Sequence, residues 1–269
     1  MTLGLKKAHL MGIGGSGMSG IAKILLAMQV EVSGCDTRPS SITDELSELG
    51  ASIYRGHDAS HLDAGTSALV HSAAVKADNP EIREAMRLNI PVLKYAQMLG
   101  RLLADKTGIA VSGTHGKTTT SAMIAWCMEG AKLAPSFVIG SAIAGIGRSS
   151  QVGGGPYFVV EACEYDRSFL NLQAHIAVTT NIEEDHLDYY RDLPEIVGAF
   201  GDFARLADAK GLYVVNAEDA GALEASREAR ARVETFGIGL AANWEASNLQ
   251  LIQGCYAFDV THEGRPFGD

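Results

Sequence analysis

The chain is poor in cysteine, long apolar runs and positive charge, and each shortage excludes a class of protein. Its four cysteines are widely spaced and form no Cys-x-x-Cys pair, so their spacing indicates neither a zinc site nor a disulfide framework. No apolar run approaches the roughly 20 residues that span a bilayer, and the N-terminus shows no cleavage pattern. The net charge of −10 argues against a nucleic-acid surface. We expect a soluble protein of the reducing cytoplasm, with no nucleic-acid or membrane partner.

Short β-branched runs alternate with helical patterns along the 269 residues, which predicts a doubly wound α/β fold with parallel sheets. In the first block we expect strands at 8–11, 30–32, 68–70 and 91–93 and helices at 21–28, 43–49 and 95–104. In the second we expect strands at 109–111, 158–160, 176–178 and 212–215, helices at 117–130 and 193–206, and a hairpin of 249–251 with 256–260. A polar stretch near residue 105 separates a Rossmann-like domain, 1–104, from a P-loop ATPase-type domain, 105–269. The second block stops at Gly268-Asp269 without a closing helix, so we expect it to be incomplete.

The most informative motif is Ser-Gly-Thr-His-Gly-Lys-Thr-Thr-Thr at 112–120, between an apolar run and a helical pattern. Its glycines let backbone N–H groups turn onto phosphate oxygens, and the helix N-terminus adds positive potential. Lys117 can reach terminal phosphates and Thr118 can hold magnesium. Val111 stands where the common pattern G-x-x-x-x-G-K-[ST] has glycine, so the loop is a variant. The motif predicts a nucleoside triphosphate ligand, with a turn carrying a solvated lysine as the structural alternative.

A second glycine motif lies at the N-terminus, where Gly12, Gly14 and Gly17 satisfy G-x-G-x-x-G between a strand and a helix. Asp36 ends the next strand about 20 residues later, where it can meet a ribose hydroxyl. Such glycines hold a diphosphate whichever nucleotide carries it. The spacing alone leaves open an NAD-dependent dehydrogenase, another diphosphate ligand and a purely structural turn.

Carboxylates and one histidine follow two strands of the second block, at 161–166 and 181–188. Ligands of open α/β sheets sit at the carboxyl ends of strands, so these segments should face the phosphates. Magnesium prefers oxygen ligands, which makes Thr118 and Glu161 its candidates. His186 could bind a second metal or orient the phosphoryl group, or it could be a hydrogen-bonded loop residue.

Most of the remaining polar residues of interest receive a structural interpretation. We interpret His9 as a satisfied core residue, and His61, His175 and His262 have no partner in sequence. His57, His71 and Ser72 could line the diphosphate cleft. The acidic residues Glu183, Glu184 and Asp188 are interpreted as solvated charges.

Several motifs in order resemble the Mur ligase family across essentially the whole chain. They are 12–20 (Gly-Ile-Gly-Gly-Ser-Gly-Met-Ser-Gly), 33–36 (Ser-Gly-Cys-Asp), 72–75 (Ser-Ala-Ala-Val) with 79–81 (Asn-Pro-Glu), 113–120, and 181–188 (Asn-Ile-Glu-Glu-Asp-His-Leu-Asp). Within the family the chain is most similar to the branch that adds L-alanine to UDP-N-acetylmuramate with ATP in peptidoglycan synthesis, a pathway of cell-wall biogenesis, cell shape and division.

The resemblance implies a role for each matching residue. The UDP-sugar would bind at Gly14, Ser16, Gly17, Met18, Asp36 and Ser72 rather than a nicotinamide cofactor. Mg-ATP would bind at Gly113, Thr114, His115, Gly116, Lys117, Thr118 and Thr119. Lys117, Glu161 and His186 would be catalytic, and Thr118, Glu161 and His186 would hold the metal. The family's C-terminal ligase domain, which supplies further ATP and amino-acid contacts, is absent, so we expect this chain to bind without turnover.

Some residues depart from the pattern of this branch. Cys163 stands where the family usually has aspartate, which removes one carboxylate. Tyr165-Asp166 resembles the murein tripeptide ligase of cell-wall recycling, whereas Ser168-Phe169-Leu170 resembles the alanine-adding branch. No lysine soon after His186 matches the carbamylated lysine of some later ligases. Tripeptide ligation and non-catalytic nucleotide binding therefore remain alternatives.

Overall fold

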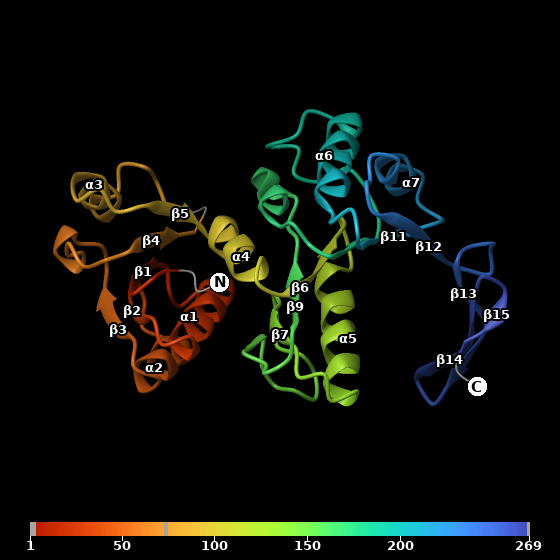
Figure 1. The fold of residues 1–269 in the computed structure, drawn as a ribbon, viewed down its shortest axis with the longest axis horizontal. Coiled ribbons are helices and arrows are strands. Elements are labelled where there is room, and N and C mark those ends of the chain that lie inside the picture. Colours follow the sequence, from red (N-terminus) through yellow and green to blue (C-terminus); the bar gives the residue numbers. More distant parts are fainter. Residues whose placement is uncertain (1–3, 73–74, 268–269) are drawn as a thin grey trace. The chain divides into compact units, whose positions relative to one another are not determined.

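The computed structural model describes residues 4–72 and 75–267, so part of the 72–75 motif and the terminal Gly268-Asp269 lie outside the described residues. The chain divides into two compact units (Figure 1). Unit 1 is Met1–Lys106 with Ser121–Glu161, and unit 2 is Thr107–Thr120 with Ala162–Asp269.

The N-terminal part of unit 1 is a five-stranded sheet in the order β3-β2-β1-β4-β5. Its strands are β1 (Lys7–Met11), β2 (Glu31–Asp36), β3 (Ser52–Arg55), β4 (Ala68–His71) and β5 (Val92–Lys94). All four pairings are parallel. The chain moves outward from β1 to β3 and then returns to β4 on the other side of β1. The strand order therefore reverses next to β1, and the carboxyl end of that strand is where an open α/β sheet binds its ligand.

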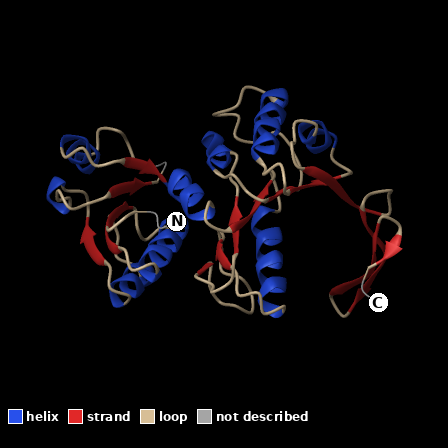
Figure 2. Ribbon diagram, viewed as in Figure 1, coloured by secondary structure: helices blue, strands red, loops and turns tan. Residues whose placement is uncertain are grey.

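Helices connect these strands, as the right-handed crossovers of a parallel sheet require (Figure 2). They are α1 (Ser16–Ala27), α2 (Ser41–Glu48), α3 (Pro80–Arg87), α4 (Tyr95–Leu103) and the short 3₁₀ helix η1 (Ala59–His61). Local sequence explains two starts. Ser40 accepts the Thr43 N–H in a capping box, and Asn79 caps α3 with Pro80 in the first turn.

The C-terminal part of unit 1 packs directly on α1. It holds β7 (Ser136–Val138), which pairs antiparallel with β8 (Ser150–Gln151) and parallel with β9 (Tyr157–Glu161). A Cβ added to Gly20 of α1 would lie 3.0 Å from Val138 Cγ1 and 3.1 Å from Ser150 Cβ. The absent side chain at Gly20 therefore lets the helix approach these strands.

Seven strands of the second sheet belong to unit 2, in the order β15-β14-β13-β12-β11-β10-β6. The strands are β6 (Thr107–Ser112), β10 (Ile176–Thr179), β11 (Leu212–Asn216), β12 (Arg232–Ile238), β13 (Trp244–Ile252), β14 (Cys255–His262) and β15 (Arg265–Pro266). Pairing is parallel from β6 to β13 and antiparallel from β13 to β15. Helices α6 (Leu193–Leu206) and α7 (Ala220–Ser226) pack side by side (Figure 1). The 3₁₀ helix η2 (Tyr165–Asn171) contacts α6, and α5 (Lys117–Gly130) crosses the division between the units.

The α/β fold class expected from the sequence is confirmed. Helices α5 and α6 have the expected bounds, and β13 with β14 is the expected antiparallel hairpin. The pattern missed β3, α3, β7, β8, α7 and β12. Within the described ranges, none of the helices combines the length and apolar character that crossing a bilayer needs.

Candidate active site

The lysine-containing loop of unit 2 links β6 to α5 in a conformation that only glycine tolerates well. Gly113 has φ +136° and Gly116 has φ +82°. A Cβ at Gly113 would also overlap Thr180 Oγ1. Thr120 N donates to Gly116 O at 2.9 Å, which closes the first turn of α5. The loop therefore lies at the N-terminus of a helix of 14 residues, where backbone N–H groups attract anions.

Residues 180–183, which follow β10, hold this loop from one side. Thr114 N donates to Asn181 O at 3.0 Å, and His115 N donates to Asn181 Oδ1 at 2.8 Å. Thr180 Oγ1 donates to His115 O at 2.7 Å, and Glu183 N donates to Thr114 Oγ1 at 2.9 Å. Two loops at neighbouring strand ends are therefore joined by a hydrogen-bond network, which fixes the backbone that would face a phosphate chain.

Lys117 forms the most concentrated set of polar contacts in the loop. Its ammonium donates to Gly113 O at 2.6 Å, to Thr114 O at 3.1 Å and to Glu164 Oε1 at 3.0 Å. The lysine side chain is 17% exposed and Glu164 is 2% exposed. A buried carboxylate thus balances the ammonium, which excludes the solvated lysine considered from the sequence.

Glu164, Asp185 and His186 form a group whose ligand-type atoms all lie within 4.8 Å of one another. His186 Nε2 is 3.6 Å from Glu164 Oε1 and 3.8 Å from Asp185 Oδ2. Glu164 Oε2 is buried and has no hydrogen-bond partner among the described residues. Two carboxylates, an imidazole and an unsatisfied oxygen beside Lys117 are suited to a divalent cation.

The other predicted metal residues, Thr118 and Glu161, lie outside this group. Thr118 is in the first turn of α5, in unit 2. Glu161 ends β9 in unit 1, where its Oε1 accepts the Gly140 N–H at 2.6 Å. The combination of Thr118, Glu161 and His186 therefore remains a prediction.

The N-terminal glycine turn of unit 1 is stabilised mainly by its own backbone and by Asp36. Gly12 has φ +72°, and the N–H groups of Gly12 and Ile13 both donate to Cys35 O, at 2.8 and 3.1 Å. Asp36 Oδ2 accepts the Gly14 N–H at 3.0 Å, which fixes Asp36 at the turn. A Cβ on Gly17 would lie 2.8 Å from Tyr95 Cζ, so this glycine permits close approach of an aromatic ring.

A cavity of about 520 Å³ opens beside this turn. Its lining includes Gly12, Asp36, His57 and Ser72. Ser16 is exposed at the start of α1, while Met18 is 3% exposed, so a ligand contact by Met18 would use its backbone N–H. The predicted UDP-sugar residues therefore gather around one turn, with Asp36 and Ser72 on the cavity wall.

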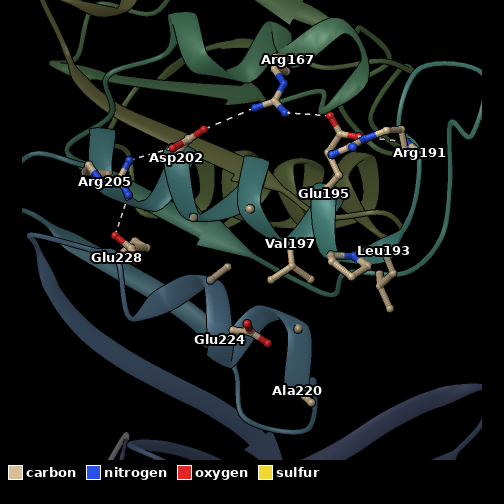
Figure 3. A pocket seen from close by; sticks show the side chains of 15 residues that line it. Arg167, Arg191, Leu193, Glu195, Val197, Asp202, Arg205, Ala220, Glu224 and Glu228 are labelled. Carbon is tan, nitrogen blue, oxygen red and sulfur yellow. Dashed lines mark hydrogen bonds and ion pairs between the residues drawn. The ribbon is translucent and has the colours of Figure 1, made fainter.

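Another cavity, of about 790 Å³, lies in unit 2 between α6, α7 and η2, and none of the predicted site residues lines it (Figure 3). Its arginines pair with carboxylates of the same wall. Arg167 contacts Glu195 and Asp202, each at 3.4 Å, and Arg205 contacts Asp202 at 2.8 Å and Glu228 at 2.6 Å. The arginine charges are therefore balanced within the wall, which leaves this groove without a concentrated positive potential for an anionic ligand.

Sequence reasoning missed two groups of polar residues. Glu164 lies in the segment 161–166 that was expected to face the phosphates, but its pairing with the loop lysine was not predicted. The second group surrounds Glu81: His61 and His57 contact its carboxylate, and His9 has a buried nitrogen without a hydrogen-bond partner among the described residues. His9 is therefore not the fully satisfied core histidine that the apolar strand suggested.

Comparison with known proteins gives a consistent result for both halves of the chain. The family model described as Mur ligase family, catalytic domain, matches residues 7–107, and the Mur ligase middle domain matches residues 111–267. The UDP-N-acetylmuramate–L-alanine ligase of Aquifex aeolicus is 44% identical over 98% of this chain and 58% of its own length. The corresponding ligase of Desulforamulus reducens is 43% identical over 98% and 57%. The chain thus spans less than two thirds of these relatives.

Solved structures agree with this result. The UDP-N-acetylmuramate:L-alanyl-gamma-D-glutamyl-meso-diaminopimelate ligase from Neisseria meningitides has a TM-score of 0.86 and 32% identity, covering 97% of this chain and 86% of that one. The UDP-N-acetylmuramate–alanine ligase from Thermotoga maritima has a TM-score of 0.80 and 28% identity, covering 97% and 59%. Both matched domains, the relatives and the structures lead to one conclusion: this chain belongs to the Mur ligase family.

Proposed function

We propose that the protein takes part in ATP-dependent amide formation, joining L-alanine to the carboxylate of UDP-N-acetylmuramate. The observation that carries this proposal is the Lys117 ammonium, held within hydrogen-bond distance of two loop carbonyls and Glu164 in a glycine loop at a helix N-terminus. The names of the 39–44% identical relatives support the choice of substrates. Family membership also favours a UDP-sugar over a nicotinamide cofactor at the first turn.

The reaction would proceed through an acyl phosphate. A carboxylate oxygen of the UDP-sugar attacks the γ-phosphorus of ATP, the bond to the β-γ bridging oxygen breaks, and ADP leaves. The amine of L-alanine then attacks the acyl carbon, phosphate leaves with its bonding electrons, and the nitrogen loses a proton. Lys117 would leave the carbonyls of Gly113 and Thr114 for the phosphates, where its charge offsets that of the transferring group.

A magnesium ion fits the residues around Lys117. Glu164, Asp185 and His186 supply an oxygen-rich donor set, and the unsatisfied Glu164 Oε2 is the atom that most needs a cation. Thr118 and Glu161 are the further candidates from the family pattern. When bound, the ion would neutralise phosphate charge. This chain's own residues bind and orient the nucleotide: the loop N–H groups hold phosphate oxygens, and residues 180–183 keep that loop in place.

At the first turn, the UDP diphosphate would lie against the N-terminus of α1, with Asp36 on the ribose and Ser72 on the cavity wall. No reacting group is needed there. This turn would position the carboxylate of the UDP-sugar by holding its nucleotide. Both ATP and the UDP-sugar would come from the cytoplasm.

Binding without turnover is the second candidate for this chain. The contacts that Lys117 makes in the glycine loop support nucleotide binding by themselves. Tripeptide ligation is the third candidate. It is supported by the 32% identical Neisseria enzyme, whose name gives the tripeptide as a substrate.

Calorimetry separates these candidates. ATP with magnesium and UDP-N-acetylmuramate should each bind the chain at one site. Phosphate release with L-alanine, compared with the tripeptide L-alanyl-γ-D-glutamyl-meso-diaminopimelate, then tests turnover and acceptor. Binding with no release supports the binding module, release with tripeptide alone moves the assignment to recycling, and failure of either nucleotide to bind contradicts the proposal.

A further inference from the structure

Five polar side chains meet inside unit 1, behind the glycine turn. They come from five places in the chain: His9 on β1, Cys35 on β2, His57 after β3, His61 at the end of η1, and Glu81 in the first turn of α3. His9, Cys35 and Glu81 are fully buried, and the side chain of His61 is 11% exposed. Such a group is costly to bury unless its members satisfy one another or hold an ion.

Glu81 lies at the centre of this cluster. Its Oε1 is 2.6 Å from His61 Nδ1 and 3.4 Å from His9 Nε2. Its Oε2 is 3.0 Å from His57 Nδ1 and accepts the Cys35 thiol at 3.1 Å. Burial and the neighbouring Glu81 raise the pKa of the Cys35 thiol, so the thiol is protonated when it makes this bond.

His9 is the member of the cluster that is left unsatisfied. Its Nδ1 is 2.9 Å from Ser33 Oγ, whereas its Nε2 is buried, faces the carboxylate, and has no hydrogen-bond partner within the part of the chain that the structure describes. When Nδ1 donates to Ser33, the Nε2 lone pair faces a carboxylate oxygen 3.4 Å away. In this tautomer two acceptors face each other in a dry core, an arrangement that a cation between them would stabilise.

We propose that His9, Cys35, His61 and Glu81 form a binding site for a zinc-type divalent transition ion. Imidazole nitrogen, thiolate and carboxylate are the zinc ligands of proteins, and four of them make the tetrahedral set of a structural site. Coordination would place the metal on Cys35 Sγ in place of the thiol proton, which leaves to solvent. The contacts that support this site do not depend on the proposed ligase activity.

The distances fit with small adjustments. All four ligand-type atoms lie within 4.8 Å of one another. A metal about 2.0–2.3 Å from each donor requires donors roughly 3.3–3.8 Å apart. The pair of His9 Nε2 and Glu81 Oε1 already has such a separation, at 3.4 Å. The distance of 2.6 Å between His61 Nδ1 and Glu81 Oε1 must lengthen. The ring of His61 stacks face to face on Tyr54 with a centroid distance of 4.3 Å, so it can turn within its own plane to allow this.

Outer partners for such an ion are also in place. Ser33 orients His9 through Nδ1, and His57 holds the second oxygen of Glu81. Partners of this kind fix the orientation of metal ligands. His57 is 27% exposed and lines the cavity of the first turn, which gives an ion a path from solvent.

An ion at this site would act on the nucleotide turn through Cys35. The carbonyl of Cys35 accepts the N–H groups of both Gly12 and Ile13, so fixing its side chain fixes the base of the turn. We therefore expect the ion to stabilise unit 1.

Cobalt titration of the chelator-treated chain tests the site. We expect one Co²⁺ to bind with intense tetrahedral d–d bands and a thiolate-to-cobalt charge-transfer band, and Zn²⁺ to displace it. Cys35→Ser should abolish the charge-transfer band, and His61→Ala should weaken binding at least about tenfold. Cys127→Ser and Cys163→Ser remove exposed thiols and should leave the band unchanged.

Thermal melting distinguishes a variant that has lost a metal-binding side chain from one that has lost its fold. Zn²⁺ should raise the Tm of the unaltered chain and of the exposed-cysteine variants, but not that of Cys35→Ser, whose metal-free circular dichroism should match the parent. His186→Ala identifies any ion held by the Glu164 group and should not affect the thiolate band. The proposal is overturned if no thiolate band appears, if the band survives Cys35→Ser, or if it follows an exposed cysteine; the cluster is then a hydrogen-bond network only.

Discussion

The two glycine turns share a position, between a parallel strand and the helix that follows it, yet differ in the charge placed beside them. In unit 1 the carboxylate of Asp36 accepts the Gly14 N–H, residues 12–17 of the turn include no lysine, and Lys76 lines the neighbouring cavity. The loop of unit 2 has the Lys117 ammonium, countered by Glu164 and followed by a carboxylate–histidine group. The first is suited to holding a nucleotide whose phosphates do not react, and the second to neutralising phosphates that do. Under the proposed function, this difference would separate a site that positions a nucleotide from a site where phosphate reacts.

Among the changes considered, the loss of Lys117 should have the largest effect, and it should act on the reaction at the second loop alone. In Lys117→Ala the barrier to phosphate release in the ligation reaction should rise by about 3 to 4 kcal/mol, a loss of rate of about 10²- to 10³-fold, because one preorganised charge is removed. Affinity for UDP-N-acetylmuramate should not change. The exposed Lys210→Ala is the matched control, and turnover by Lys117→Ala near that of Lys210→Ala would show that the two turns do not differ as argued.

Acid titration tests how much Glu81, in the polar cluster behind the first turn, contributes to stability. Burial alone would raise the pKa of Glu81, but the imidazoles and the thiol around it outweigh burial and lower that pKa from 4.5 to about 2. The folded-state pKa is depressed, so the stabilisation is complete above pH 4.5 and is lost as the pH falls towards 2. Its full size is about 3 kcal/mol.

Urea unfolding of the metal-free chain, measured at steps from pH 5 downwards, checks this. The parent should lose stability steadily over that range. Glu81→Gln should be less stable at pH 5 and should show a flatter pH dependence, while the exposed Glu48→Gln should follow the parent. Equal acid slopes for the parent and Glu81→Gln would contradict the pKa assignment.

Changing a glycine in the backbone of the second loop should have a smaller effect on stability and on ATP binding. Gly113→Ala places a side chain at φ +136° against Thr180 Oγ1, which should cost about 2 kcal/mol of unfolding free energy and weaken ATP binding. Gly130 ends the same helix with open space around it, so Gly130→Ala should be neutral or slightly stabilising. Denaturation with calorimetry on both variants measures the difference. An unstrained Gly113→Ala that binds ATP normally would argue against a fixed phosphate loop.

The sequence predicted the local parts of these sites and missed the parts that folding assembles. Both glycine turns and the bounds of α5 follow from short-range signals, namely glycine spacing and apolar periodicity. The pairing of Lys117 with Glu164 joins residues 47 positions apart, and the Glu81 cluster joins five elements. No cysteine spacing could indicate that cluster, because only the β1–β2 register brings His9 and Cys35 near each other. Strand β3 was missed because it is only four residues long, whereas α3 was missed although Asn79 and Pro80 give a local start signal for it.

Substitution of Asp36 should cause the smallest change in ligand affinity. It also gives the clearest test of whether the two turns bind independently. Its carboxylate accepts the N–H groups of Gly14 and Arg38, at 3.0 and 3.1 Å, and would also meet the ribose. Asp36→Ala should therefore weaken UDP-N-acetylmuramate binding by about 1 kcal/mol, roughly fivefold, and leave ATP affinity unchanged. Calorimetry with each nucleotide measures both, with the exposed Glu48→Ala as control. If ATP affinity fell as much as UDP-sugar affinity, the turns would be energetically coupled, and a positioning site could no longer be separated from a reacting one.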